Sequence, residues 1–159
     1  MRISVFRAAC LSLFFAVGLS SHVYSNATDL APSEFASTEQ RQLLTLEQWG
    51  DSNRALLGQT GKAQQMLVSQ QGIYNSINAM QFGELNMASL AQSGVMNTIS
   101  LIQHGQLNTA DIAQCASQAS ASVLQLGNGN RAEIQQYKNF SYAVVNQIGD
   151  NGKALLVQH

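Results

Sequence analysis

The 159-residue sequence contains few charges, one proline and two cysteines. Charged residues make up 11% of the chain and the net charge is -1, whereas charged residues usually form about a quarter of a protein. This excludes a basic nucleic-acid binder held by phosphate contacts and argues against a charge-rich disordered chain. Cys10 lies in a segment that we expect to be removed. The mature chain would keep only Cys115, so we expect no internal disulfide framework.

Amide side chains, by contrast, are abundant. The sequence has nineteen glutamines and twelve asparagines. Such a composition is typical either of a prion-like low-complexity chain or of an ordered protein whose amides stack in ladders. The two alternatives differ in whether the amides are scattered or evenly spaced.

The N-terminus has the pattern of a secretory signal peptide. Two arginines precede a short apolar run, which small residues follow. The run is too short to cross a membrane, and we expect cleavage after Ser25. The sequence therefore predicts a signal peptide at 1–25. A poorly ordered export and targeting segment at 26–47 and a repeat domain of ten units at 48–159 complete the predicted organisation.

Glutamine recurs at intervals of eleven residues, at positions Gln48, Gln59, Gln70, Gln81, Gln92, Gln103, Gln114, Gln125, Gln136, Gln147 and Gln158. Two residues after a glutamine there is usually a glycine: Gly50, Gly61, Gly72, Gly83, Gly94, Gly105, Gly127 and Gly149. Five residues after it there is often an asparagine: Asn53, Asn75, Asn86, Asn97, Asn108 and Asn130. Nine residues after it there is an aliphatic residue in every unit. Repeats of this kind predict a repetitive fold.

The spacing inside each unit indicates β-strands. An eleven-residue period also suits a right-handed coiled coil. However, the positions from the asparagine to the next glutamine recur every two residues, which places them on one face of a strand and on opposite sides of a helix. We expect seven-residue strands such as Asn53–Gln59 and four-residue turns such as Trp49–Ser52. An additional strand is expected before the ten units, because residues 42–48 fit the same template.

An antiparallel meander and a solenoid are both compatible with these strands. The solenoid is favoured, because two strands and two turns per coil place identical residues on one another and allow buried amides to bond along the stack. We therefore predict an all-β, amyloid-like β-solenoid of about five 22-residue coils. We expect both ends to present open strand edges, with no obvious capping element at the C-terminus, and such edges are templates for adding more chain.

The repeat resembles that of the curlin family. The units that begin at Gln48 and Gln125 match the curlin pattern position by position, and the resemblance extends over 48–159. The segment 29–35 and the even spacing resemble the minor curlin subunit more than the major one. Several positions toward the C-terminus depart from the pattern: Ala116, Ala119, Lys138, Ser141 and Gly152.

This resemblance implies a structural, non-enzymatic component of curli, the extracellular amyloid fibres of biofilms. A minor subunit would nucleate polymerisation of the major subunit at the cell surface. Its implied partners are the major curlin subunit, further copies of itself, the outer-membrane secretion pore and an accessory surface-anchoring factor. Residues 136–159 correspond to the atypical repeats tied to surface attachment. Separately from the resemblance, Lys153, Leu155 and Val157 make the last outward face unusually apolar, which suits either an attachment or docking surface or an edge that pairs with the next subunit.

Other functional classes have weaker support in the sequence. A major, fibre-forming curlin is the alternative within the family, and a soluble secreted β-solenoid adhesin or carbohydrate-active enzyme is the alternative outside it. Arg131 and Glu133 have the spacing of a solvated ion pair. His104 and His159 have no partners at metal-ligand spacing. We therefore assign no catalytic, cofactor-binding or metal-binding residues.

Overall fold

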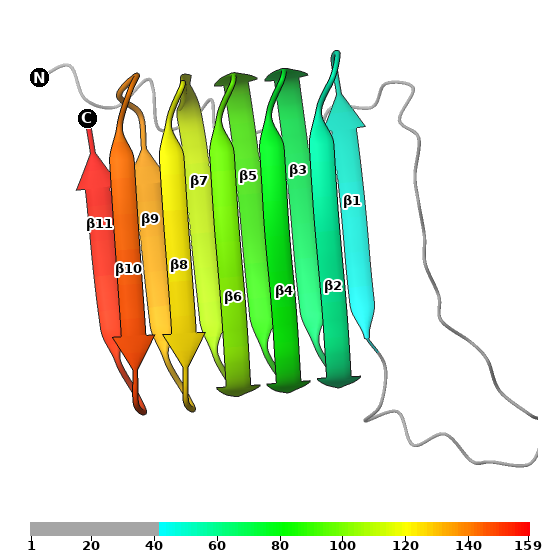
Figure 1. The fold of residues 1–159 in the computed structure, drawn as a ribbon, viewed down its shortest axis with the longest axis vertical. Helices are drawn as coiled ribbons and strands as arrows, with labels where there is room; N and C mark the ends of the chain where they lie inside the picture. The colour runs from blue at the N-terminus through cyan, green and yellow to red at the C-terminus, as the bar shows by residue number, and fades with distance from the viewer. Residues whose placement is uncertain (1–41) are drawn as a thin grey trace, which may run out of the picture.

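The computed structural model describes residues 42–159, and these residues form strands and turns without a helix. The predicted signal peptide and residues 26–41 of the predicted export segment lie outside the described residues. Eleven strands follow one another along the chain (Figure 1). Their bounds are β1 Leu43–Trp49, β2 Arg54–Lys62, β3 Gln65–Ile73, β4 Ser76–Glu84, β5 Met87–Val95, β6 Thr98–Gln106, β7 Thr109–Ser117, β8 Ser120–Leu126, β9 Arg131–Gln136, β10 Tyr142–Ile148 and β11 Lys153–Gln158.

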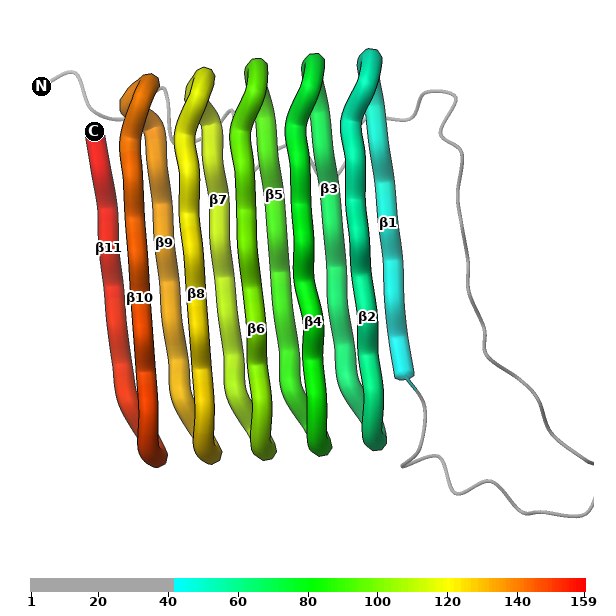
Figure 2. The backbone as a smooth tube through the Cα atoms, viewed as in Figure 1, coloured from blue at the N-terminus to red at the C-terminus, as the bar shows by residue number. Residues whose placement is uncertain are grey.

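The strands alternate between two parallel sheets. Sheet A has the order β1-β3-β5-β7-β9-β11, and sheet B has the order β2-β4-β6-β8-β10. Each strand pairs with the strand 22 residues further along the chain, so that Gln81 lies beside Gln103 and Ala79 beside Leu101. The backbone therefore winds as a flat coil with two strands per turn (Figure 2). The prediction of a β-solenoid with about five coils is confirmed, and the parallel pairing excludes the meander.

The first strand begins before the first clear repeat. β1 starts at Leu43 and pairs with β3 over its whole length. The additional strand expected over residues 42–48 is therefore present. The solenoid includes the last residues of the segment 26–47.

The strands are longer than predicted and begin one residue later. β2 to β7 each contain nine residues rather than seven. The backbone pairing of β4 with β6, for example, continues past Gln81 and Gly83 to Glu84. The reason is that the bend itself stacks on the bend of the next coil, so its backbone also pairs in register.

A left-handed residue closes every turn. The residue four positions after each of the first ten repeat glutamines has a positive φ, and in nine turns it is not glycine. Leu85 is an example, with φ 57°, and its N–H donates to the carbonyl of Lys62 at 3.0 Å. Left-handed backbone costs a non-glycine residue about 1–2 kcal/mol. Here the contact with the preceding coil offsets that cost.

The core is a thin layer between the two sheets. Its members come from the alanine and aliphatic columns of the repeat: Met66, Val68, Ile77, Ala79, Ala88, Leu90, Ile99, Leu101, Ala110, Ile112, Ala121, Val123, Ala132, Ile134, Ala143 and Val145. Because successive residues of a strand point to opposite faces, the residues between these columns point outward. The core is therefore one apolar stripe that runs the length of the solenoid.

The expectation of no internal disulfide concerns the mature chain and stays a prediction. Cys115, which lies in β7, is disulfide-bonded. Its partner lies outside the described residues. The full chain still carries the second cysteine, which removal of a signal peptide would eliminate, so the expectation concerned a different form of the protein.

The glycine column supplies a direct test of the fold. Gly83 has a φ of 111°, and a Cβ placed on it would lie 2.0 Å from the carbonyl oxygen of Gly105 in the next coil. We expect Gly83→Ala to destabilise the solenoid by roughly 2–4 kcal/mol, because the backbone of two coils must separate. The change is measured as the shift in the free energy of unfolding by circular dichroism.

Gly58→Ala is the matched control. The only atoms that a Cβ at Gly58 would meet belong to the flexible side chain of Met80, and Gly58 has no positive φ. This substitution should cost much less. Equal losses for the two variants would show that the close backbone contact does not limit the fold.

Candidate functional site: amide ladders and open strand edges

The repeat glutamines form two ladders of side-chain hydrogen bonds. Nε2 of each glutamine donates to Oε1 of the glutamine 22 residues later, at 2.5–2.8 Å. The sheet A ladder contains Gln48, Gln70, Gln92, Gln114, Gln136 and Gln158. The sheet B ladder contains Gln59, Gln81, Gln103, Gln125 and Gln147. Every bond points the same way along the solenoid axis.

The second amide hydrogen of each glutamine joins the two sheets. From Gln59 onward, Nε2 also donates to the backbone carbonyl sixteen residues earlier, at 3.0–3.3 Å. Gln103 of β6, for instance, donates to the carbonyl of Met87 in β5. This contact also fixes which end of the amide is the nitrogen, because an oxygen placed there would face the carbonyl oxygen. The glutamines thus set both the register and the direction of each ladder.

The asparagines bond chiefly to the backbone, although Asn75 also donates from Nδ2 to Oδ1 of Asn53 at 3.2 Å. Asn86 donates from Nδ2 to the carbonyls of Phe82 and Gly105, both at 3.0 Å, and its Oδ1 accepts the N–H of Asn108 at 3.0 Å. The sequence predicted stacking of asparagine on asparagine, and the stacking is present. The bonds differ because the shorter asparagine side chain reaches the turn backbone first, so each one clamps two coils together at the bend.

Four asparagine positions hold another residue, and two of these leave a buried polar atom without a partner. Gln64 bonds to Thr60 and Gly83 through Nε2, but its buried Oε1 accepts nothing. The buried hydroxyl of Ser141 also has no partner. Ala119 carries no amide at all. Together with Ala116 and Lys138, Ala119 and Ser141 weaken the turns that lead from β7 to β8 and from β9 to β10.

The two outer faces of the solenoid differ in charge. The outer face of sheet A carries Glu47, Asp111, Arg131, Glu133 and Lys153, whereas the strands of sheet B carry Arg54, Lys62 and Glu84. Stacking in register brings like charges together. Partial burial against the neighbouring strands raises the pKa of Asp111 above 3.8, the adjacent Glu133 raises it further and Arg131 lowers it. Arg131 also lies 3.8 Å from Glu133, as expected for a solvated pair.

Four strands present edges that no described residue pairs with. β1 and β2 lie at one end of the two sheets, and β10 and β11 lie at the other (Figure 1). The predicted docking residues lie on β11, where Lys153 and Leu155 are exposed and Val157 is half-buried. Leu155 is 67% exposed. The glutamines and asparagines of the repeat, in contrast, line the inside of the coil and become accessible only at its ends.

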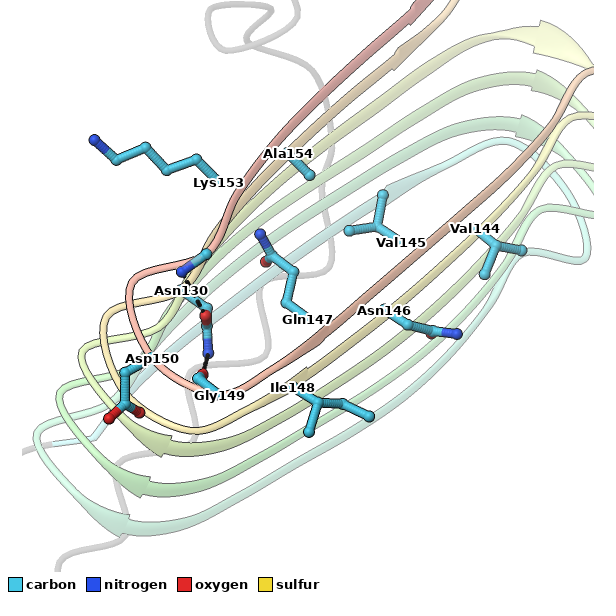
Figure 3. A pocket seen from close by; sticks show the side chains of 11 residues that line it. Asn130, Val144, Val145, Asn146, Gln147, Ile148, Gly149, Asp150, Lys153 and Ala154 are labelled. Atoms are coloured by element: carbon cyan, nitrogen blue, oxygen red, sulfur yellow. Dashed lines mark hydrogen bonds between the residues drawn. The ribbon is translucent and has the colours of Figure 1, made fainter.

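The C-terminal end contains a hollow of about 480 Å³ between β10 and β11. Val145, Gln147 and Ala154 lie between the sheets at this end, while Lys153 points away from them (Figure 3). The hollow arises because β11 extends sheet A by one strand beyond β10. Its lining repeats the aliphatic, alanine and glutamine columns of the interior, so its chemistry suits one more strand of the same repeat.

Part of the chain is similar to a known protein family. Residues 108–137 match the model of the curlin associated repeat. The match covers β7, β8 and β9 with the turns between them, and it supports the curlin resemblance of the sequence. No curated protein and no solved structure shows significant similarity to the chain.

Two other kinds of site are absent from residues 42–159. In this part of the chain there is no group of three or more His, Cys, Asp or Glu arranged to hold a metal ion. No helix there is long and apolar enough to cross a membrane.

The sequence-based prediction did not include the hydrogen bonds from the repeat glutamines to the backbone of the opposite sheet. The constant interval of eleven residues could have predicted these bonds. Only a constant interval places every repeat glutamine at the same distance from the backbone carbonyl sixteen residues earlier. The pairing of Tyr137 with His159 was also missed: their rings stack 5.4 Å apart with an interplanar angle of 3°. The two residues are 22 positions apart, so the repeat period itself contains this information.

The glutamine ladder can be tested at its centre. Gln103 is fully buried and bonds to Gln81, Gln125 and Met87. We expect Gln103→Leu to lower the free energy of unfolding by roughly 3 kcal/mol or more, because the substitution leaves several buried polar groups unpaired. Gln71→Leu is the control, since Gln71 is exposed on the outer face. Equal stability of the two variants would contradict a structural role for the ladder.

The unpartnered oxygen of Gln64 predicts a stabilising substitution. Gln64→Asn shortens the side chain by one methylene and lets Oδ1 accept the N–H of Asn86, as happens at the other asparagine positions. We expect a gain of about 1 kcal/mol in the free energy of unfolding. Gln64→Ala serves as the comparison and should be less stable than the wild type. A loss of stability in Gln64→Asn would show that the extra methylene is needed.

Proposed function

We propose that this chain is a structural subunit of curli, and specifically a minor curlin that nucleates polymerisation of the major subunit into extracellular amyloid fibres. The observation that carries the proposal is the in-register parallel stack, in which both ends of the described solenoid present strand edges with the same repeated pattern of side chains. The curlin repeat match at residues 108–137 supports the choice of family.

Templating follows from the physics of the open edges. An incoming chain must order its backbone, which costs about 1–2 kcal/mol per residue, and long-range strand pairing is slow because loop closure precedes any favourable contact. A preformed edge supplies backbone groups, a row of core side chains and the next position of each amide ladder at once. The first strand of the incoming chain is then stabilised as it forms, and the lag before polymerisation shortens.

The remaining elements of the proposal have their support in the resemblance. We propose that a signal peptide is removed and that the segment 26–47 directs export through the curli pore of the outer membrane. Attachment to the cell surface would involve an accessory factor and residues 136–159. The weakened turns around Ala119 and Ser141 fit a terminal region that differs from the regular repeats, and the exposed Lys153 and Leu155 are the docking residues that we assign to it.

A seeding assay tests the nucleator role. The mature chain, added at substoichiometric amounts, should shorten the lag of a major curlin several-fold and should bind amyloid dyes. A chain that stays monomeric and leaves the lag unchanged would contradict the proposal. A chain that polymerises rapidly alone, but adds to major curlin only in proportion to its own mass, would instead indicate the major, fibre-forming subunit.

The triple variant Gln59→Leu, Gln81→Leu and Gln103→Leu is the matched test of mechanism within the same assay. It removes most of the sheet B ladder and leaves the glutamines of sheet A unchanged. We expect it to seed markedly more slowly than the wild type. A variant that seeds at the wild-type rate would mean that the amides do not set the register of incoming strands.

A further inference from the structure

The glutamine ladders have a direction, and the two ends of the solenoid are therefore chemically different. At the C-terminal end, Gln147 and Gln158 donate to the carbonyls of Arg131 and Tyr142, and their second amide hydrogen has no partner among the described residues. At the other end, Oε1 of Gln48 and Oε1 of Gln59 accept no bond from any residue in 42–159. One end therefore presents donors, and the other presents acceptors.

The described strands are also odd in number. At the C-terminal end, sheet A therefore extends one strand further along the solenoid axis than sheet B. Sheet A has six strands and sheet B has five, which leaves one empty position beside β10 at the C-terminal end. The hollow between β10 and β11 marks this position. A second molecule stacked in the same orientation would pair its β1 with β11. The position beside β10 would then stay empty at every junction.

We infer that a second copy of this chain docks with its β1 beside β10 and its β2 beside β11, which requires a half-turn of the copy about the solenoid axis. This inference rests on the proposed self-templating function and adds its geometry. Successive molecules stack from the C-terminal end of one to the N-terminal end of the next. Sheet A of each molecule continues as sheet B of the following one.

The register of this junction follows from the eleven-residue period. A shift of 99 residues places Gln48 of the next copy beside Gln147 and Gln59 beside Gln158, so that both free amide hydrogens meet a free Oε1. The same shift places Leu46 beside Val145, both of which belong to or pack against the core. A stack of donor end on donor end would instead bring unpaired amide hydrogens together.

One contact in this junction is unfavourable. The shift places Arg54 of the next copy beside Lys153, and like charges on neighbouring strands repel. The fold already contains such a contact, because Lys153 pairs with Arg131 within sheet A. The repulsion slows docking at low ionic strength without preventing it, and salt screens it.

The interface is heterologous, because the surfaces that meet are different on the two partners. Such an interface does not close into a dimer, and repetition generates an open filament. Each junction adds a strand pair in both sheets, whereas stacking without the half-turn adds a pair only in sheet A. The half-turn arrangement therefore leaves fewer backbone groups unpaired.

Site-directed cross-linking distinguishes the arrangements. The full chain with Cys10→Ser and Cys115→Ser provides a background without other thiols. In the half-turn junction, Leu56 of the next copy lies beside Leu155, about 4.8 Å away as for any neighbouring strands, and both side chains are exposed. Assembled Leu56→Cys/Leu155→Cys chains should therefore give a ladder of covalent oligomers with a short bismaleimide, measured on a denaturing gel.

Thr45→Cys/Leu155→Cys is the matched control, because Thr45 would lie beside Leu155 only without the half-turn. The single variants Leu155→Cys and Leu56→Cys report stacking of like ends as covalent dimers. Strong cross-linking in any of these controls, or none in the Leu56→Cys/Leu155→Cys pair, would overturn the inference. Fibres that seed a major curlin but cross-link in a control would leave the proposed function intact, whereas a chain that neither assembles nor seeds would contradict both.

Salt dependence supplies a second readout. Lys153→Thr removes the like-charge contact with Arg54 and introduces a residue that already occupies the same column at Thr109. Self-assembly of this variant should be several-fold faster than that of the wild type at low salt, and the difference should fade as salt rises. An unchanged rate at low salt would place Lys153 away from the junction and would contradict the inferred register.

Discussion

The structure depends on the requirement that a buried amide keep its hydrogen bonds. The inward glutamines of the central coils are fully buried between two sheets that offer little other polar chemistry. The group that offers both a donor and an acceptor within hydrogen-bonding distance is the glutamine 22 residues earlier or later, in the neighbouring coil. A slip of one residue would turn every side chain to the other face, and a slip of two would place an amide on an aliphatic residue. The ladder thus allows a single register.

This constraint explains the scarcity of charge. Every outward residue has a neighbour 22 positions away, so a charge repeated in every unit would form a column of like charges. The chain keeps a few charges and distributes them, as in the stacked pair Lys62 and Glu84, whose ion pair is 4.0 Å long. Where like charges do stack, as at Asp111 and Glu133, burial and then the adjacent Glu133 raise the pKa of Asp111. A composition poor in charge is therefore a consequence of the in-register stack.

The same constraint leaves the solenoid open along one direction only. Its outer faces are covered by side chains, but the outer edges of its first and last described strands have no described partner. Each ladder also ends in an unused donor or acceptor. The repeat that stabilises one molecule is therefore the repeat that recognises the next one. The weakened turns near Ala119 and Ser141 show that the regular pattern relaxes toward the C-terminal end, where the proposed docking residues lie.

The sequence by itself determined the period, the columns and the inside of the coil. The eleven evenly spaced glutamines predicted a β-solenoid with 22 residues per coil, because an amide that recurs in phase with the strands must stack on its equivalent. Only the tertiary structure decided how the bends are built. It showed that Gly83 lies within the ladder, that Asn86 clamps the backbone instead of another amide, and that the left-handed Leu85 closes the turn. It also decided the direction of the ladders and the unequal ends of the two sheets. These features depend on which carbonyl lies within reach of each amide nitrogen, and that distance exists only once the chain is coiled.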